Sequence, residues 1–326
     1  MLGDRRIQLV RTALTAAVLV AGGVTIYLNR GELAALTQLS AFALLGLTAS
    51  LGAFFLTTGY TFCLLVSMLS VRLSAREWIG LTFLTNAINY LGPIRPGVVA
   101  KAAYLKRKGM AYSRFSSILA ANGFLVLLYS GLAGLLLLLY GWLTRGIGSL
   151  PLVAVCMALI VVALMPFLVP LFRLEREGRF RMLVNNAVQG FREIRSQRGK
   201  MAAVGATVVL QYLLSACSCI ISYRSLGFEM DLVTALALGV LLSVSNLVTI
   251  TPNNLGVQEM VMAYFYAMTG MDFTNGLLGA GLIRAVHILL TFGLAPILTY
   301  WLMSSAHLRL SALVSARDPA REEPQA

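Results

Sequence analysis

The chain has 326 residues, of which 58% are hydrophobic and only 12% are charged, and its mean hydropathy is +0.81. Because a water-soluble chain of this length needs many more polar groups to cover its surface, the composition excludes a soluble globular protein and indicates a polytopic helical membrane protein. The net charge of +13 raises nucleic acid as a partner, but the basic residues are distributed in the pattern of a membrane protein, as described below, and no nucleic-acid partner is predicted.

The first part of the chain predicts two membrane crossings. An arginine-rich N-terminus precedes an uncharged span at 12–29, which is long enough to cross the hydrocarbon core once. A cleaved signal peptide is the alternative, but the long apolar part has no clear small-residue cleavage site, so a retained anchor is favoured. Residues 33–71 hold the second crossing. Ser74 and Glu77 then have the spacing of a helix capping box.

Residues 78–108 predict a helical hairpin. The apolar run at 78–91 is too short to cross comfortably, and two prolines and two glycines end it between Gly92 and Gly97. Residues 98–108 are too basic to cross in turn. A re-entrant hairpin, which enters and leaves on one side, satisfies both facts if its irregular tip is buried in protein or faces water.

Three more crossings are predicted in the middle of the chain, at 115–142, 150–172 and 201–223, and prolines 166 and 170 kink the second of them. Between them, at about 173–198, apolar residues recur at helical spacing with arginines on the other face. This pattern predicts a cytoplasmic amphipathic helix in the headgroup plane. A soluble connecting helix is the alternative.

A second interrupted segment follows at 232–270. Its apolar sequence breaks at TPNNLG, residues 251–256, and resumes as a shorter apolar helix. The last crossing is predicted at 274–303, and residues 306–326 are expected to form a disordered cytoplasmic tail.

The two interrupted segments are related by a shift of 159 residues along the sequence. Repeat 1 spans about 74–143 and repeat 2 about 232–304. Three crossings separate the hairpins, so the repeats are inverted. Interrupted helices at corresponding positions of two inverted repeats indicate a transport site near the middle of the membrane. The shift superimposes Pro252, Gly256 and Val257 on Pro93, Gly97 and Val98.

The predicted fold is therefore an all-α polytopic membrane protein with about six full transmembrane helices plus two re-entrant helical hairpins in inverted repeats. Residues 1–305 form a single transmembrane domain. If the N-terminus is cytoplasmic, most of the 26 Lys and Arg residues fall on the cytoplasmic side, in agreement with the positive-inside rule. We predict a bacterial cytoplasmic (inner) membrane protein with both termini in the cytoplasm.

The two hairpin tips supply groups that favour an anion. Each second half-helix begins deep in the membrane, near Gly97 and Gly256, where unpaired N–H groups and the positive end of the helix dipole attract negative charge. Arg95 lies in the first tip and Lys101 lies one turn into the following half-helix. These groups predict a phosphate site, although the two cations also have a topological interpretation as part of the basic cluster at 106–108.

Glu259 and Arg284 are the two charged residues that the predicted topology leaves inside the membrane, away from both surfaces. An ionisable group at a helix centre costs about 2.5–3.5 kcal/mol to insert, so it normally has a partner and a role. One interpretation is a structural ion pair between the last helix and the second hairpin. The others are a headgroup contact for Arg284 and a proton-carrying or ammonium-contacting role for Glu259. For His287, one turn from Arg284, a hydrogen bond within the bundle is favoured over ligand binding.

Asparagines flank both breaks, where they are suited to line a polar cavity, although capping and turn roles explain them equally well. No metal or cofactor site is predicted, because the four cysteines lie in apolar stretches and no histidine has the spacing of a zinc ligand to them. No nucleotide loop or nucleophile motif is present, so no enzyme is predicted. The predicted substrate-binding residues are Asn89, Arg95, Gly97, Lys101, Asn253, Asn254, Gly256, Glu259, Arg284 and His287.

Three features carry a family resemblance: the PxxxGV breaks at Pro93 and Pro252, the NxxxxLGPxRPG first hairpin with its basic cluster, and the TPNNLGVQE stretch. From about Arg11 to Met303 the chain resembles the flippase-like transmembrane family, also described as the lysylphosphatidylglycerol synthase transmembrane region. Members of the multiple-peptide-resistance type join this module to an aminoacyltransferase domain, and the module moves the aminoacylated lipid between leaflets. Here only a short polar tail follows the last helix, so the resemblance implies a stand-alone lipid-handling module without lysyl transfer.

Two functions follow as hypotheses. The first is a transporter that binds a lipid phosphate headgroup between the hairpins and moves it across the bilayer. The lipid is an anionic phospholipid, an aminoacylated phospholipid or a polyprenyl phosphate. The second is a non-transporting membrane partner or anchor of a lipid-modifying enzyme or glycosyltransferase, with the amphipathic segment as its docking surface. A homo-oligomer is also compatible with the sequence.

Overall fold

The computed structural model describes Tyr27 and residues 39–90, 95–145, 150–168, 179–247 and 251–315. Within these residues, helices are the only regular elements, as the composition predicted. Their bounds are α3 (Ala41–Met68), α4 (Ala75–Asn89), α5 (Pro96–Arg107), α6 (Tyr112–Arg145), α7 (Leu150–Leu168), α8 (Arg179–Ser196), α9 (Arg198–Ser225), α10 (Leu232–Ser245), the 3-10 helix η2 (Pro252–Asn254), α11 (Val257–Met268) and α12 (Phe273–Ser315).

Four of the described helices are long and apolar enough to cross a membrane, namely α3, α6, α9 and α12. They correspond to four of the six predicted crossings. The apolar part of α7, Leu150–Met165, is a shorter helix, and α10 is shorter still. The first predicted crossing, at 12–29, lies outside the described residues. The chain is therefore a multi-pass helical membrane protein.

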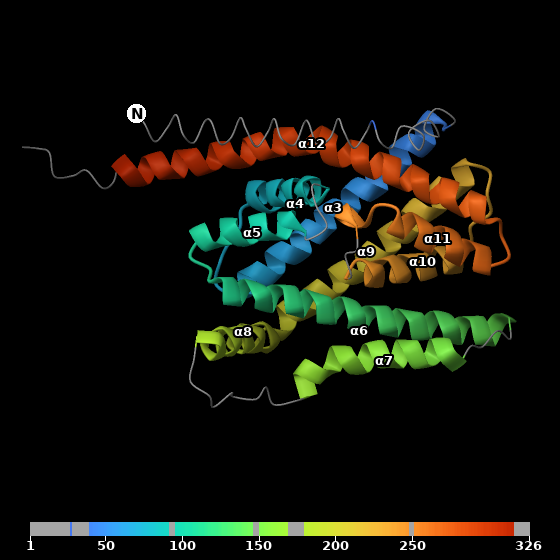
Figure 1. Cartoon of the computed structure of the whole chain (residues 1–326), viewed down its shortest axis with the longest axis horizontal. Coiled ribbons are helices and arrows are strands. Elements are labelled where there is room, and N and C mark those ends of the chain that lie inside the picture. Colours follow the sequence, from blue (N-terminus) through green and yellow to red (C-terminus); the bar gives the residue numbers. More distant parts are fainter. Residues whose placement is uncertain are drawn as a thin grey trace, which may run out of the picture.

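Both predicted breaks separate pairs of shorter helices. In the first hairpin, α4 ends at Asn89 and α5 begins at Pro96, while in the second, η2 stands between α10 and α11. The two hairpins enter the bundle from opposite ends of its long axis, and their tips approach each other near the middle (Figure 1). The long helices run along the same axis on both sides of them.

Each hairpin packs against long helices from the other half of the chain. The first half-helix of hairpin one, α4, packs against α12, which follows hairpin two. The first half-helix of hairpin two, α10, packs against α6, which follows hairpin one, and also against α9. This reciprocal packing brings the two tips to a common centre, where Arg95 contacts Asn246 and Tyr90 contacts Arg284.

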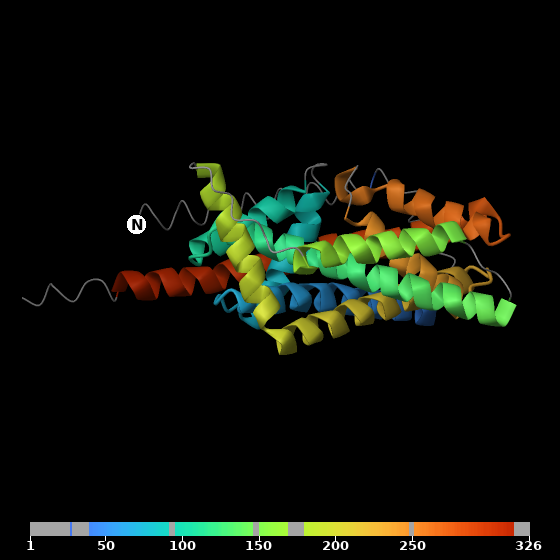
Figure 2. The ribbon, with the colours of Figure 1, turned by 90° about the horizontal axis from the view of Figure 1, so that it is seen from below.

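The amphipathic segment forms α8, which runs across one end of the bundle rather than along it (Figure 2). Its apolar residues Phe191 and Ile194 are buried against Ile118 of α6, and Arg114 of α6 pairs with Glu193 at 3.2 Å. Gly190 lies so close to Ser117 that an added Cβ would be 2.7 Å from the serine hydroxyl. In its described part, the apolar side of α8 thus packs against protein.

The last helix is longer than the sequence predicted. The backbone of α12 continues through Ser315, past residue 306, where a disordered tail was expected to begin. The physical reason lies in the sequence, since no glycine or proline occurs between Pro296 and Pro319 to end the helix. Residues 316–326 lie outside the described residues.

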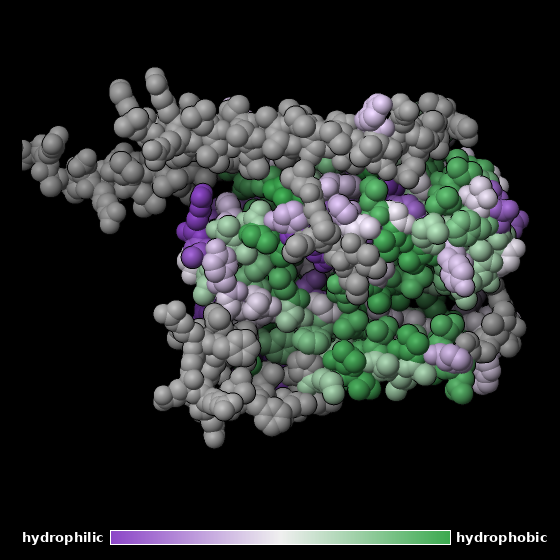
Figure 3. Space-filling model, viewed as in Figure 1, coloured by the Kyte–Doolittle hydropathy of each residue, from purple (hydrophilic) through white to green (hydrophobic). Residues whose placement is uncertain are grey.

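Apolar side chains cover much of the outer surface, over α6 and α7 and around α10 and α11 (Figure 3). Large exposed hydrophobic residues on this surface include Leu136, Trp142, Leu150, Val155 and Met165. Such a surface is stable only against lipid. The same view shows a hollow near the centre of the molecule, where hydrophilic surface is visible between apolar parts.

Candidate functional site

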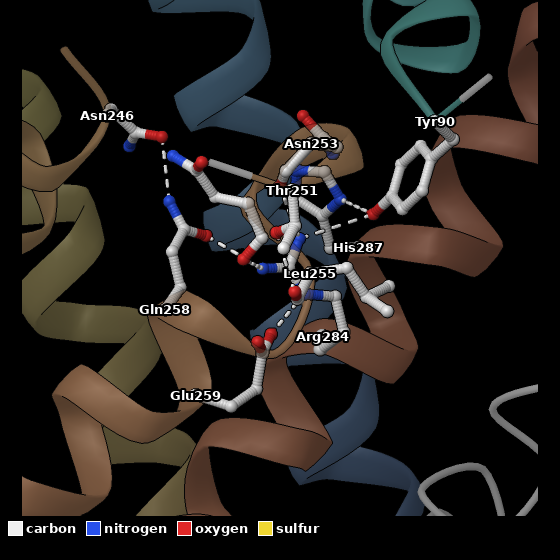
Figure 4. Close-up of polar contacts among 10 residues, drawn as sticks. Tyr90, Asn246, Thr251, Asn253, Leu255, Gln258, Glu259, Arg284 and His287 are labelled. Carbon is white, nitrogen blue, oxygen red and sulfur yellow. Dashed lines mark hydrogen bonds and ion pairs between the residues drawn. The ribbon is translucent and has the colours of Figure 1, made fainter. Parts of the chain in front are cut away.

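Arg284, in the N-terminal half of α12, is the centre of a polar network at the two hairpin tips. Its side chain is only 4% exposed. A guanidinium has five N–H donors, and the structure supplies five acceptors (Figure 4). The Nε group pairs with the Glu259 carboxylate, while Nη2 donates to the Gln258 side chain at 2.8 Å. Arg284 is therefore fully satisfied by protein groups in this conformation.

The tip of the second hairpin turns its main-chain carbonyls toward Arg284. The carbonyl oxygens of Asn253 and Asn254 each lie 3.4 Å from an Arg284 nitrogen. Both asparagines adopt left-handed backbone conformations, with φ of 47° and 54°, and Gly256 follows with φ of 79°. Asparagine and glycine are the residues that tolerate this region best, so the sequence Asn-Asn-Leu-Gly allows the turn that presents these carbonyls.

Glu259 lies in the first turn of α11, where a carboxylate is favoured by the helix dipole. It is buried, and its Oε1 atom accepts from Arg284. The other carboxylate oxygen, Oε2, is buried and has no hydrogen-bond partner among the described residues. The predicted ion pair between the last helix and the second hairpin is thus present, with one carboxylate oxygen left over.

The first hairpin reaches the same network through Tyr90, the residue that ends α4. Its hydroxyl lies 3.4 Å from Arg284 Nη1 and 3.0 Å from Nδ1 of His287. The His287 ring also packs against Phe55, with 4.7 Å between ring centroids. His287 therefore makes a hydrogen bond within the bundle, as the sequence favoured.

A second link joins the tips through Asn246, which ends α10. The Arg95 guanidinium donates to the main-chain carbonyl of Asn246, and the Asn246 side chain accepts from Gln258 at 2.7 Å. Because Gln258 also accepts from Arg284, the network runs from Arg95 to Arg284 through two amides. Arg95 itself holds a left-handed conformation, with φ of 46°.

Asn89 and Gly97 face each other within the first hairpin. The Gly97 N–H donates to Oδ1 of Asn89 at 3.0 Å. A Cβ added at Gly97 would overlap the Thr85 carbonyl, so α5 approaches α4 as closely as only a glycine allows. Asn89 thereby satisfies one N–H at the start of α5, which is the capping role that the sequence left as an alternative.

Lys101 lies apart from the Arg284 network. Its ammonium group is 4.2 Å from the centre of the Phe62 ring in α3, a cation–π contact. The side chain is partly buried and has no ion pair among the described residues.

The base of the first hairpin holds a separate charged cluster around Glu77. Lys108 pairs with the Glu77 carboxylate at 2.5 Å, the Tyr104 hydroxyl donates at 2.9 Å, and the Ser74 N–H donates at 2.8 Å, as the capping box predicted. Burial raises the pKa of Glu77, but these hydrogen bonds and the Lys108 charge outweigh it and lower the pKa to about 2. This cluster closes the hairpin at the end opposite its tip.

The sequence missed three residues that hold the tips together: Tyr90, Asn246 and Gln258. Each is adjacent to a helix end or to a break, and that position is the only signal the sequence offers for them. The described residues contain no group of three or more His, Cys, Asp and Glu side chains able to hold a metal ion. The polar chemistry of the site consists instead of guanidinium, amide, phenol and carboxylate groups around two helix breaks.

This fold and site define a polytopic helical membrane protein with two interrupted helical segments that meet at a buried polar centre. The chain belongs to the family described as the lysylphosphatidylglycerol synthase TM region, whose model matches residues 14–295. The family places the protein in phospholipid metabolism or transport, with membrane phospholipids as its partners. No curated protein and no solved structure matches the chain significantly.

Proposed function

We propose that the protein binds the phosphate-containing headgroup of a lipid between the two hairpin tips and moves that lipid between the leaflets of the membrane. The observation that supports this most is the meeting of the tips. Side chains from hairpin one, Arg95 and Tyr90, contact hairpin two or its Arg284 partner directly. A polar centre at this point of an otherwise apolar bundle is costly, and a transport pathway is the usual reason for one.

In this proposal the hairpins are re-entrant, and the bundle axis lies along the membrane normal. The base of hairpin one carries the basic residues 106–108 and lies at the α8 end of the bundle (Figure 1). The base of hairpin two carries Glu229, Asp231 and Asp272 instead. The positive-inside rule then places the α8 end in the cytoplasm of a bacterium, with α8 in the headgroup plane.

The described conformation corresponds to closed tips. Arg95 and Gln258 both bond to Asn246, and Arg284 bonds to groups from both tips. A headgroup phosphate offers oxygen acceptors to the same donors, so it can replace the Asn246 carbonyl as the partner of Arg95. No covalent step is involved, and the protein is not an enzyme in this proposal.

The test is lipid movement in vesicles. The purified protein is reconstituted in liposomes that contain fluorescent phospholipids, and dithionite quenching reports lipid that reaches the outer leaflet. Wild-type protein is expected to accelerate quenching over empty vesicles. Arg95→Gly is expected to slow it, because it removes the charge while keeping a residue suited to the left-handed conformation.

Arg107→Ala is the matched control, because Arg107 is an exposed cation at the far end of the same helix. It is expected to leave quenching unchanged. Failure of the wild-type protein to accelerate quenching of any anionic, aminoacylated or polyprenyl-phosphate lipid would contradict the proposal. Full activity of Arg95→Gly would contradict the role of the tip.

A further inference from the structure

The direction of the hydrogen bonds between Arg284 and Asn246 is fixed by the chemistry of the groups. A guanidinium donates and cannot accept, so the side-chain atom of Gln258 that faces Arg284 must be its oxygen. This oxygen accepts from Arg284 Nη2 at 2.8 Å. The amide nitrogen of Gln258 then points the other way and donates to Oδ1 of Asn246 at 2.7 Å. The orientation of both amides therefore follows from the charge of Arg284.

The amide nitrogen of Asn246 is the group that this chain leaves over. Its Nδ2 atom makes no hydrogen bond among the described residues, and Asn246 is exposed. The Asn246 oxygen is turned toward Gln258, while the nitrogen lies outside the network (Figure 4). Two N–H donors are thus held in one orientation at the tip of hairpin two, without an acceptor.

Arg95 lies against the same residue. Its guanidinium donates to the main-chain carbonyl of Asn246, so no other residue separates the guanidinium from the Asn246 amide. Arg95 has no carboxylate partner among the described residues. Together the two side chains offer N–H donors and one positive charge at a single place. This combination suits an anion whose oxygens only accept hydrogen bonds.

We infer that Asn246 is a headgroup-binding residue, whose side-chain amide donates to the phosphate of the lipid that Arg95 binds, and that Gln258 is the positioning residue that turns this amide outward. The inference rests on the proposed function and adds a second contact to the same headgroup. The free oxygens of a phosphate accept and do not donate, so they require the nitrogen of Asn246 rather than its oxygen. Reversal of the amide would place two acceptors face to face.

Two variants of Asn246 test the contact. Native mass spectrometry of the intact protein in detergent micelles measures the binding of short-chain phosphatidylglycerol and of a polyprenyl monophosphate. Asn246→Asp has nearly the same shape and still accepts from Gln258, but it has no donor. Asn246→Ala removes the donor without adding a charge. Both are expected to bind the two lipids about tenfold or more weakly, the size of one charge-assisted hydrogen bond.

The melting temperature separates a binding role from a structural one. Asn246→Asp is expected to melt at the wild-type temperature or above it, because the new carboxylate pairs with Arg95. Asn275→Asp is the matched control, since it makes the same chemical change at the start of α12, at the base of hairpin two. It is expected to leave lipid binding unchanged. Equal losses of binding in Asn275→Asp and Asn246→Asp would overturn the inference.

Gln258→Met tests the positioning role. It keeps an apolar chain of similar length but leaves the Asn246 amide without its hydrogen bond, and is expected to weaken lipid binding about fivefold. If Gln258 acts through Asn246, the same change is expected to have no further effect on binding in the Asn246→Ala background. Losses that add in the double variant would overturn the positioning role.

The outcomes distinguish the inference from the function on which it rests. If Asn246→Ala binds both lipids as wild-type protein does, the assignment of Asn246 is overturned and the proposed transport stands. Inorganic phosphate is added as a competitor and is expected to compete far more weakly than short-chain phosphatidylglycerol. If it competes equally well, the bound anion is free phosphate and the headgroup assignment is overturned. If no lipid binds and none is moved in the vesicle assay, both proposals are overturned.

Discussion

The Arg95 guanidinium donates a hydrogen bond to the main-chain carbonyl of Asn246, so a side chain at the tip of one hairpin caps the C-terminal end of a helix in the other. A cation is favoured there, because the last carbonyls of a helix have no intrahelical partner and carry the negative end of the dipole. The contact couples the two halves of the chain at their most irregular points.

The first prediction concerns the conformation of Arg95. Its left-handed backbone costs a residue with a Cβ roughly 1–2 kcal/mol relative to glycine. Arg95→Ala loses the contact with Asn246 and keeps this cost, whereas Arg95→Gly loses the contact and relieves the cost. Arg95→Gly is therefore expected to be about 1 kcal/mol more stable than Arg95→Ala, measured by thermal unfolding in detergent. An equal or lower melting temperature for the glycine variant would contradict this.

The second prediction concerns the Glu259–Arg284 pair. Removing either partner leaves the other charge buried and unpaired, which costs about 3–5 kcal/mol. Removing both leaves no buried charge, so the double variant Glu259→Gln, Arg284→Met is expected to lose much less than the two single variants together. Unfolding in mixed detergent measures all three.

The Arg114–Glu193 pair is the control for that comparison, because both of its side chains are more than one-third exposed. Each single change there is expected to cost less than about 1 kcal/mol, and the two changes to add. Additive costs at Glu259 and Arg284 as well would show that the buried pair is no more coupled than the exposed one.

The third prediction concerns the approach of α5 to α4. A methyl group at Gly97 would overlap the Thr85 carbonyl and lie 2.7 Å from the Asn89 side chain. Because main chain cannot move aside as a flexible side chain does, Gly97→Ala is expected to cost about 1–3 kcal/mol. Gly52→Ala is the control, as a Cβ at Gly52 in α3 meets nothing within 4 Å. It is expected to be neutral or slightly stabilising, and a similar melting temperature for both variants would contradict the close packing.

The fourth prediction concerns pH and the Glu77 cluster. The pKa of Glu77 is lowered from 4.5 to about 2 in the folded protein, so the folded state favours the ionised carboxylate. Its stabilising contribution is complete above pH 4.5 and is lost as the pH falls from there toward 2. Thermal unfolding is expected to show this loss in wild-type protein and a flatter profile over the same range in Glu77→Gln. Identical profiles would contradict the assignment.

The breaks were predictable because proline and glycine act locally. Pro96 begins α5, because a proline cannot extend a helix from the preceding residues, and Asn253, Asn254 and Gly256 adopt the left-handed turn that few other residues accept. The Glu259–Arg284 pair was predictable by elimination, because no other charges were confined to the apolar segments. In both cases, the property belongs to the residue itself or to its immediate neighbours.

The remaining part of the site depends on which helices face each other, and residue type does not reveal that. Tyr90 and Gln258 resemble many other polar residues near helix ends, and only the packing of α4 on α12 brings Tyr90 to Arg284. Lys101 was predicted beside the phosphate site, but its neighbour is Phe62, from a helix distant in sequence. For residues 306–315 the reason is different: they were grouped with the polar residues that follow them into an expected disordered tail, although no glycine or proline in them ends the helix.

Because α4 packs against α12 and α10 packs against α6, each hairpin is enclosed partly by helices from the other half of the chain. The two halves of the chain therefore depend on each other for part of the packing of their hairpins. A gene divided at Gln197, between α8 and α9, should yield two fragments that accumulate only when they are produced together. Evolution can then alter one half only as far as the other continues to accept it.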